Sequence, residues 1–312
     1  MLIDIYSMSK FKKNCNLFIK RFYFIILGTL STTLAFNQSL NCNNIDTSHC
    51  YTVKQYRDTK IFVEKKIESE DTIFLYQIPF LADLDKDCIP EIILLDNNYN
   101  ELLFINSLTG KKKNKIKIPA LFPFGSKFAL ADLNGDGESE IVVLAANSGI
   151  NPQAYFGRLF CFRLDGTQMW MSDKRVDVYK QFREMPGGAI GIADFNQDGM
   201  PEVYVNNKIF NGQTGALLCD GGSNGLGLEY AIDFAPDGVS VAAQLDDDVK
   251  DLELAAGYTI YKMNLTNLNG SIGNTMTPHN LMINGKFRDG YTSIGDINVD
   301  GKLDVVVTSP GI

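Results

Sequence analysis

The chain has 312 residues, 45% of them hydrophobic, and carries a formal net charge of −8 at pH 7. A chain of this length and apolar content can bury one large or two ordinary cores, which argues against an intrinsically disordered protein. The excess of acidic side chains argues against a nucleic-acid-binding protein and favours divalent cations as partners.

Residues 1–35 have the pattern of an export signal. A basic stretch over residues 10–21 precedes an apolar run over residues 22–36, and Thr33 and Ala35 place small residues at the −3 and −1 positions of a cleavage site. The alternative is a membrane anchor, but the apolar run is shorter than the ~20 residues that a transmembrane helix needs. We therefore expect a mature chain without a membrane span, secreted or held at the cell surface.

Residues 36–75 form a polar N-terminal segment. In the oxidising compartment that an export signal implies, Cys42 and Cys50 are the expected disulfide pair. Cys161 and Cys219 lie inside apolar runs, so we expect both to be buried thiols.

From residue 76 to residue 312 the sequence repeats one acidic pattern, each time followed by a run of strand-forming residues. The four clear copies are ADLDKDCIPEIILL from Ala82, ADLNGDGESEIVVL from Ala131, ADFNQDGMPEVYVN from Ala193 and GDINVDGKLDVVVT from Gly295. A fifth copy, AQLDDDVKDLELAAG from Ala243, is degenerate: Gln244 replaces the first acid, and the loop is one residue shorter before Asp251. A repeat at a near-constant interval is the dominant signal for the architecture.

A second signal lies between consecutive copies, where a turn containing Gly is flanked by apolar runs. These turns fall near Gly110, Gly166, Gly215 and Gly270. Each period thus contains two hairpins, or about four strands, which is typical of a β-propeller blade. We predict an all-β fold, a propeller of four-stranded blades in which about five repeats form an incomplete ring of a larger propeller. The alternative is a five-bladed ring that strands near residues 61–63 and 73–76 complete.

Numbered from its first acid, each acidic loop offers side-chain oxygens at positions 1, 3, 5 and 9 and a backbone carbonyl at position 7. Position 6 needs a residue that tolerates positive φ. This oxygen-only set suits Ca²⁺ better than Mg²⁺ or Zn²⁺. The predicted ligands are Asp83, Asp85, Asp87 and Glu91 in the first loop; Asp132, Asn134, Asp136, Glu140 and the carbonyl of Glu138 in the second; Asp194, Asn196, Asp198, Glu202 and the carbonyl of Met200 in the third; and Asp296, Asn298, Asp300, Asp304 and the carbonyl of Lys302 in the last.

Two other interpretations fit the loops less well. The acids could be turn formers whose side chains bond their own backbone, but four loops with one spacing favour metal. An EF-hand needs its closing Glu at position 12 on a helix, whereas here the acid at position 9 precedes a β-run. The first loop is compromised because Cys88 stands where the other clear copies have Gly, at a cost of ~1 kcal/mol. The degenerate copy, with Asp246, Asp248 and Asp251, is expected to bind weakly or not at all.

The pattern D-x-[DN]-x-D-G-x-x-[DE] before a β-run resembles the FG-GAP repeats of the integrin alpha-chain propeller and the related VCBS-type repeats of secreted bacterial proteins. The resemblance covers roughly residues 76–312, and Phe124 and Gly125 echo its FG element. It implies that the loop joins the first two strands of a blade, that Ca²⁺ rigidifies one face of the propeller, and that the opposite face or its side binds proteins or glycans. The sequence otherwise matches the residues that give the FG-GAP repeat its name poorly, which favours a bacterial VCBS-like relative.

We therefore expect a calcium-binding module that binds an extracellular protein or carbohydrate, with Tyr155, Phe156 or Tyr179 as candidate contact residues. The alternative is a propeller-based polysaccharide-active enzyme, a lyase or hydrolase, or the non-catalytic part of one. The sequence supports it poorly, because there is no G-x-S-x-G motif and His279, one of only two histidines, is expected in a loop. A quinone-cofactor propeller is indicated only by the turn at residues 165–170.

Overall fold

The computed structural model describes residues 3–5, 65–67, 79–96, 101–118, 128–145, 157–176, 178–179, 185–186, 188–227, 239–282, 286 and 289–308. Its elements within these ranges are all β-strands. Among them are four four-stranded antiparallel sheets and a further two-stranded sheet, which we call blades 1 to 5 in chain order. The fold is all-β, as the sequence predicts.

Each four-stranded blade is a meander in which consecutive strands pair. Blade 1 contains β3 (Phe80–Ala82), β4 (Glu91–Asp96), β5 (Glu101–Asn106) and β6 (Lys112–Lys117). Blade 2 contains β7 (Phe128–Ala131), β8 (Glu140–Leu144), β9 (Leu159–Phe162) and β10 (Gln168–Met171). Blade 3 contains β13 (Ile190–Ala193), β14 (Glu202–Val205), β15 (Lys208–Phe210) and β16 (Leu217–Asp220). Blade 4 contains β17 (Ser240–Ala243), β18 (Glu253–Ala256), β19 (Thr259–Asn264) and β20 (Thr275–Asn280), and blade 5 contains β21 (Tyr291–Gly295) and β22 (Asp304–Thr308).

Two short pairings lie outside the blades. Strand β1 (Ile3–Ile5) pairs with β2 (Lys65–Ile67), and β11 (Val178–Tyr179) pairs with β12 (Met185–Pro186).

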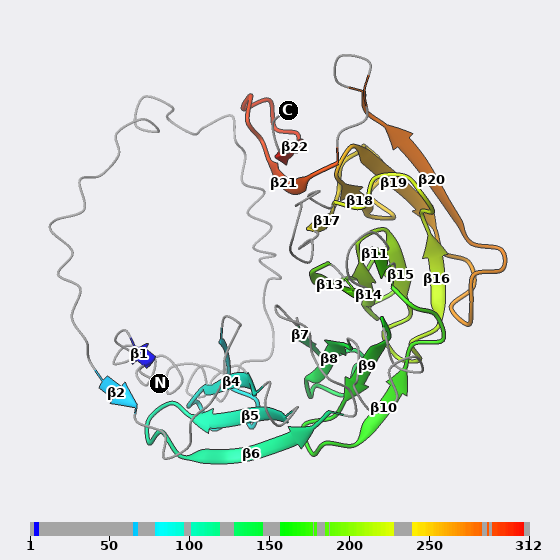
Figure 1. Ribbon diagram of the computed structural model, residues 1–312. Coiled ribbons are helices and arrows are strands. Elements are labelled where there is room, and N and C mark those ends of the chain that lie inside the picture. The colour runs from blue at the N-terminus through cyan, green and yellow to red at the C-terminus, as the bar shows by residue number, and fades with distance from the viewer. Residues whose placement is uncertain are drawn as a thin grey trace, which may run out of the picture.

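The blades follow one another around an arc. The first strands β7, β13 and β17 lie on its inner side, and the fourth strands β6, β10, β16 and β20 lie on its outer side (Figure 1). Four-stranded antiparallel sheets repeated radially with this strand order define the blades of a β-propeller. The structure therefore confirms the propeller architecture predicted from the repeats.

The core lies between neighbouring blades. Phe104 of blade 1 belongs to the same buried cluster as Phe160 of blade 2, and further clusters join blade 2 to blade 3 and blade 3 to blade 4. Trp170 of blade 2 adds a polar link, because its indole N–H donates a 2.8 Å hydrogen bond to the carbonyl of Gly212 in blade 3. The second strands are covered on both sides, which explains the continuous apolar runs at residues 92–95 of β4 and 141–144 of β8.

The predicted Gly turns join the third and fourth strands of blades 1 to 3. Gly110, Gly166 and Gly215 have positive φ values of 72°, 89° and 72°, which a residue without Cβ adopts at little cost. In blade 4 the turn is wider, and the positive φ of 90° falls on Gly273 instead of Gly270.

The prediction that His279 lies in a loop is wrong. His279 is an exposed residue of β20 and pairs with Ile260 of β19. The neighbouring Pro278 had favoured a loop, but β20 is the outermost strand of its blade. A strand at the edge of a sheet tolerates proline because its outer N–H needs no partner strand.

Cys161 and Cys219 are buried and not disulfide-bonded, as predicted. Several other sequence predictions fall outside the described residues: the export signal apart from β1, the Cys42–Cys50 bridge, the strands near residues 61–63 and 73–76, Tyr155, Phe156 and the side chain of Tyr179. Within the described ranges, no helix is long and apolar enough to cross a membrane.

Candidate metal loops

The acidic loops occupy the same place in all five blades. Each one joins the first strand of its blade to the second: residues 83–91, 132–140, 194–202 and 296–304 in blades 1, 2, 3 and 5, and the degenerate loop in blade 4. In every blade the last residue of the first strand pairs with the closing acid, for example Ala131 with Glu140 and Ala193 with Glu202. This is the placement that the FG-GAP resemblance implies.

Loops of adjacent blades also contact one another. Lys86 of the first loop forms a 3.1 Å ion pair with Glu138 of the second, and Lys302 of the last loop forms a 3.2 Å ion pair with Asp247 of the degenerate loop. The loops therefore lie beside one another on one face of the propeller.

The backbone of the clear loops is left-handed at position 6, as predicted. The φ values are 65° at Cys88, 84° at Gly137, 90° at Gly199 and 86° at Gly301. Position 4 is left-handed as well, with φ values of 60° at Lys86, 76° at Gly135, 55° at Gln197 and 59° at Val299. The sequence did not reveal this second turn, because only one of the four loops has Gly there.

The acids hold the loops closed through hydrogen bonds to the backbone. The carboxylate at position 1 accepts the N–H of position 6, at 2.8 Å from Cys88 to Asp83, 2.7 Å from Gly137 to Asp132, 2.8 Å from Gly199 to Asp194 and 2.9 Å from Gly301 to Asp296. The acid at position 9 accepts the N–H of position 2, at 3.0 Å from Leu84 to Glu91, 2.8 Å from Leu133 to Glu140, 2.9 Å from Phe195 to Glu202 and 2.9 Å from Ile297 to Asp304. The acids thus have a turn-forming role, whatever else they bind.

Burial disfavours the ionised form of the closing glutamates, although each of them accepts a backbone hydrogen bond. Glu140 and Glu202 are 1% and 2% exposed. Burial raises the pKa of Glu140, and it raises the pKa of Glu202 to about 7, with the nearby Asp198 and Asp194 adding to the rise. A bound cation would remove this penalty, because an opposite charge at short range favours the ionised carboxylate.

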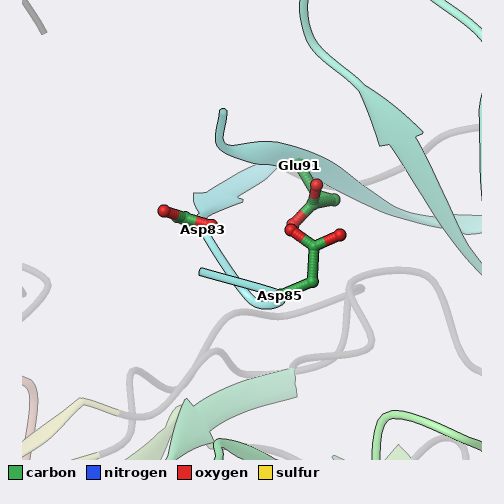
Figure 2. Close-up of side chains that lie close together, drawn as sticks. All are labelled: Asp83, Asp85 and Glu91. Carbon is green, nitrogen blue, oxygen red and sulfur yellow. The ribbon is translucent and has the colours of Figure 1, made fainter. Parts of the chain in front are cut away.

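The first loop gathers its acids more tightly than the others. Oxygens of Asp83, Asp85 and Glu91 lie within 4.8 Å of one another, and no other three acids of the described residues come this close. Figure 2 shows the carboxylates of Asp85 and Glu91 facing each other. Asp85 and Glu91, together with Asp87, contact the ammonium of Lys113, whose Nζ lies 2.5 Å from Asp85, 3.3 Å from Asp87 and 2.7 Å from Glu91.

Lys113 is a residue of this site that the sequence analysis missed. The hydrogen bond from its ammonium is the main cause of the lowered pKa of Asp85, and the bonds to Asp85 and Glu91 raise the pKa of Lys113 in turn. A second missed feature is covalent, because Cys88 at position 6 is disulfide-bonded. The basic run at residues 111–115 was the available signal for Lys113, but it does not show which lysine points into the loop.

The degenerate loop of blade 4 was aligned incorrectly from the sequence. The residue that pairs with Ala243 is Glu253, and Glu253 accepts the N–H of Leu245 at 2.7 Å, as the closing acids do elsewhere. The loop is therefore one residue longer than the others, not shorter, and its closing acid is Glu253 instead of Asp251. Lys262 of β19 pairs with Asp246 at 2.7 Å and lies 3.6 Å from Asp248.

The donor sets of the second, third and last loops fit Ca²⁺. Each combines carboxylate and amide oxygens at positions 1, 3, 5 and 9 with a glycine of positive φ at position 6. Among the described residues, no lysine or arginine forms an ion pair with the carboxylates at positions 1, 5 and 9 of these loops, in contrast to the first loop. A hard cation is the group that these oxygens would hold.

Comparison with known proteins identifies the repeat. Residues 83–143, which include the first two acidic loops, match the family described as FG-GAP-like repeat. This match confirms the resemblance stated from the loop pattern. Comparison with curated proteins gave no match.

Similar solved structures include the V. cholerae biofilm matrix protein Bap1, with 22% identity, a TM-score of 0.39 and coverage of 59% of this chain and 24% of that one. The rhamnogalacturonan lyase YesW has 14% identity, a TM-score of 0.46 and coverage of 74% and 43%. The exotype rhamnogalacturonan lyase YesX has 17% identity, a TM-score of 0.37 and coverage of 74% and 53%. The chain spans less than two thirds of the length of each of these structures.

Proposed function

We propose that this protein is a secreted or cell-surface β-propeller that binds Ca²⁺ in its acidic loops and acts as a binding or adhesion module for an extracellular protein or carbohydrate. The observation that carries the proposal is the recurrence of one complete oxygen set in three blades. The second, third and last loops share their acid positions, their glycine and their place between the first two strands.

In each of these loops Ca²⁺ would supply the positive charge that offsets the clustered acids. The chain's own contribution is the geometry. Asp132, for example, accepts the N–H of Gly137, and Glu140 accepts the N–H of Leu133, so hydrogen bonds within the chain hold these two acids in place. Little further ordering is then needed on binding, and preorganisation of this kind strengthens binding.

Calcium would matter for function because it would stiffen the loop face. Exposed apolar side chains lie in the loops of blades 3 to 5, at Met200, Val249, Ile297 and Val299. Exposed apolar side chains that gather on one face are typical of surfaces that bind other molecules. We infer that this face contributes to ligand binding when its loops are held by metal.

Binding to immobilised extracellular proteins and polysaccharides, in Ca²⁺ and in EDTA, tests the proposal. The expected result is retention on at least one class of ligand in Ca²⁺, lost in EDTA and in the variant with Asp132→Asn, Asp194→Asn and Asp296→Asn. Equal retention of the wild type in both buffers would contradict a calcium-dependent module. Release of new chain ends from a polysaccharide during the same incubation would instead favour the enzyme alternative.

A further inference from the structure

Lys113 reaches the first loop because it is the extra residue of a β-bulge. In the pairing of β5 with β6, Ile105 faces Lys112 and Phe104 faces Asn114, so Lys113 has no partner of its own. A bulge redirects the side chain of its extra residue relative to the regular pleat. The bulge thus allows a side chain of the fourth strand to point at a loop between the first two strands.

The same bulge recurs at the equivalent ladder position in blades 2 and 3. In blade 2 Phe162 faces Gln168 and Cys161 faces Trp170, which leaves Met169 as the extra residue. In blade 3 Phe210 faces Leu217 and Ile209 faces Cys219, which leaves Leu218. The extra residue is therefore a lysine in blade 1 but an apolar residue in blades 2 and 3.

This difference matches the charge balance of the three loops. In the first loop the Lys113 ammonium lies within 3.3 Å of carboxylate oxygens from Asp85, Asp87 and Glu91. The second and third loops receive no such cation from Met169 or Leu218, and their buried closing glutamates lack an ion-pair partner among the described residues. Within the described residues the second loop forms one ion pair, in which Lys86 contacts the exposed side chain of Glu138.

We propose that Lys113 is the built-in cation of the first loop, and that this loop consequently takes up no Ca²⁺ in the native protein. The ammonium lies at the point where the three carboxylates converge, so a metal ion could enter only by displacing it. Metal binding is then confined to the second, third and last loops. This inference rests on the proposed calcium loops and specifies which of them bind.

In blade 4 a lysine also pairs with the acids of the loop, but it comes from a different strand. Its third and fourth strands pair without a bulge, and the cation comes from Lys262 on the third strand, which pairs with Asp246. Among the described residues, a lysine from the third or fourth strand therefore pairs with the acids of two loops, the first and the degenerate one, and these are the two that lack glycine at position 6 of the motif. The absence of glycine at position 6 thus coincides with the presence of a lysine that pairs with the acids of the loop.

Counting bound Ca²⁺ by native mass spectrometry and isothermal titration calorimetry on the full purified protein tests the proposal. The wild type should bind three ions. Lys113→Met, which gives blade 1 the residue that blade 2 has, should bind four, and Lys113→Gln should do the same. The matched control is Lys115→Met, on the same strand but paired with Glu101 at 3.0 Å outside the loop, and it should bind three.

Four ions on the wild type, or an unchanged count in both Lys113 variants, would overturn the role of Lys113. No ion on the wild type together with one on Lys113→Met would support that role but refute the proposed calcium loops. No ion on any variant would refute both.

Hydrogen exchange on the wild type alone gives a second test that does not depend on folding of a variant. The amides of Leu84 and Leu133 make equivalent hydrogen bonds to Glu91 and Glu140. Removal of Ca²⁺ should accelerate exchange of the Leu133 amide at least tenfold and leave the Leu84 amide unchanged. Equal acceleration of both amides would show that the first loop also depends on metal.

Discussion

The backbone N–H of Phe195 donates a 2.9 Å hydrogen bond to the buried carboxylate of Glu202. This bond ties the second residue of the third loop to the first residue of β14. The equivalent bond is present in every acidic loop, including the degenerate one, where Leu245 donates to Glu253. The closing acid is therefore the structural anchor of each loop as well as a candidate metal ligand.

Glu202 should make the stability of the metal-free protein depend on pH. Its pKa is raised from 4.5 to about 7, chiefly by burial. Between these values the folded state binds more protons than the unfolded state, so Glu202 makes the protein less stable as pH rises through this window. We expect urea unfolding in EDTA to show this decline, and Glu202→Gln to reduce it. An identical decline in the variant would contradict the assignment.

Gly137→Ala should weaken the second loop through the backbone alone. Gly137 has φ +84°, and an added Cβ would meet no atom within 4 Å, so steric overlap with neighbours is not a factor. The left-handed conformation costs an L-residue roughly 1–2 kcal/mol, which is the expected loss in free energy of unfolding by urea. Gly270→Ala is the control, because that site is equally open and its φ is not positive, and its stability should change little. Equal effects at the two sites would be inconsistent with this explanation.

Val299→Gly should stabilise the metal-free protein. Val299 is 73% exposed and holds φ at 59°, a conformation that a β-branched residue adopts only under strain. Relief of this strain should contribute about 1 kcal/mol in urea unfolding. Val249→Gly is the control, since Val249 is 71% exposed without positive φ and should gain nothing. A Val299 variant no more stable than the Val249 variant would disprove the claim of strain.

The repeated features of this fold were predictable from the sequence. The acidic pattern located the five loops, and Gly137, Gly199 and Gly301 marked the left-handed residue at position 6 in three of them. These features depend on residues close together in the chain, so the sequence pattern carries them directly.

The missed features depend on how strands pair. Lys113 points into the first loop because a bulge shifts the pairing by one residue, and no local pattern marks the bulge. Glu253 closes the degenerate loop because Ala243 pairs with it, whereas the sequence spacing does not distinguish Asp251 from Glu253, which stand one residue before and one residue after position 9. A strand at His279 could be predicted only if β20 were known to be the outermost strand of its blade, where Pro278 is tolerated. Each outcome is decided by contacts between residues distant in the sequence.

Thermal unfolding in Ca²⁺, Mg²⁺ and EDTA tests the central claim most directly. An ion that binds only the folded state adds about 2.7 kcal/mol per site at a free concentration of about 100 times its Kd, so several sites should raise Tm by many degrees. We predict this rise in Ca²⁺, little change in Mg²⁺, and a reduced rise when Asp132, Asp194 and Asp296 are all changed to Asn. An unchanged Tm on adding Ca²⁺ to a folded sample shown to be metal-free would mean that these acids only form turns, and would contradict the account.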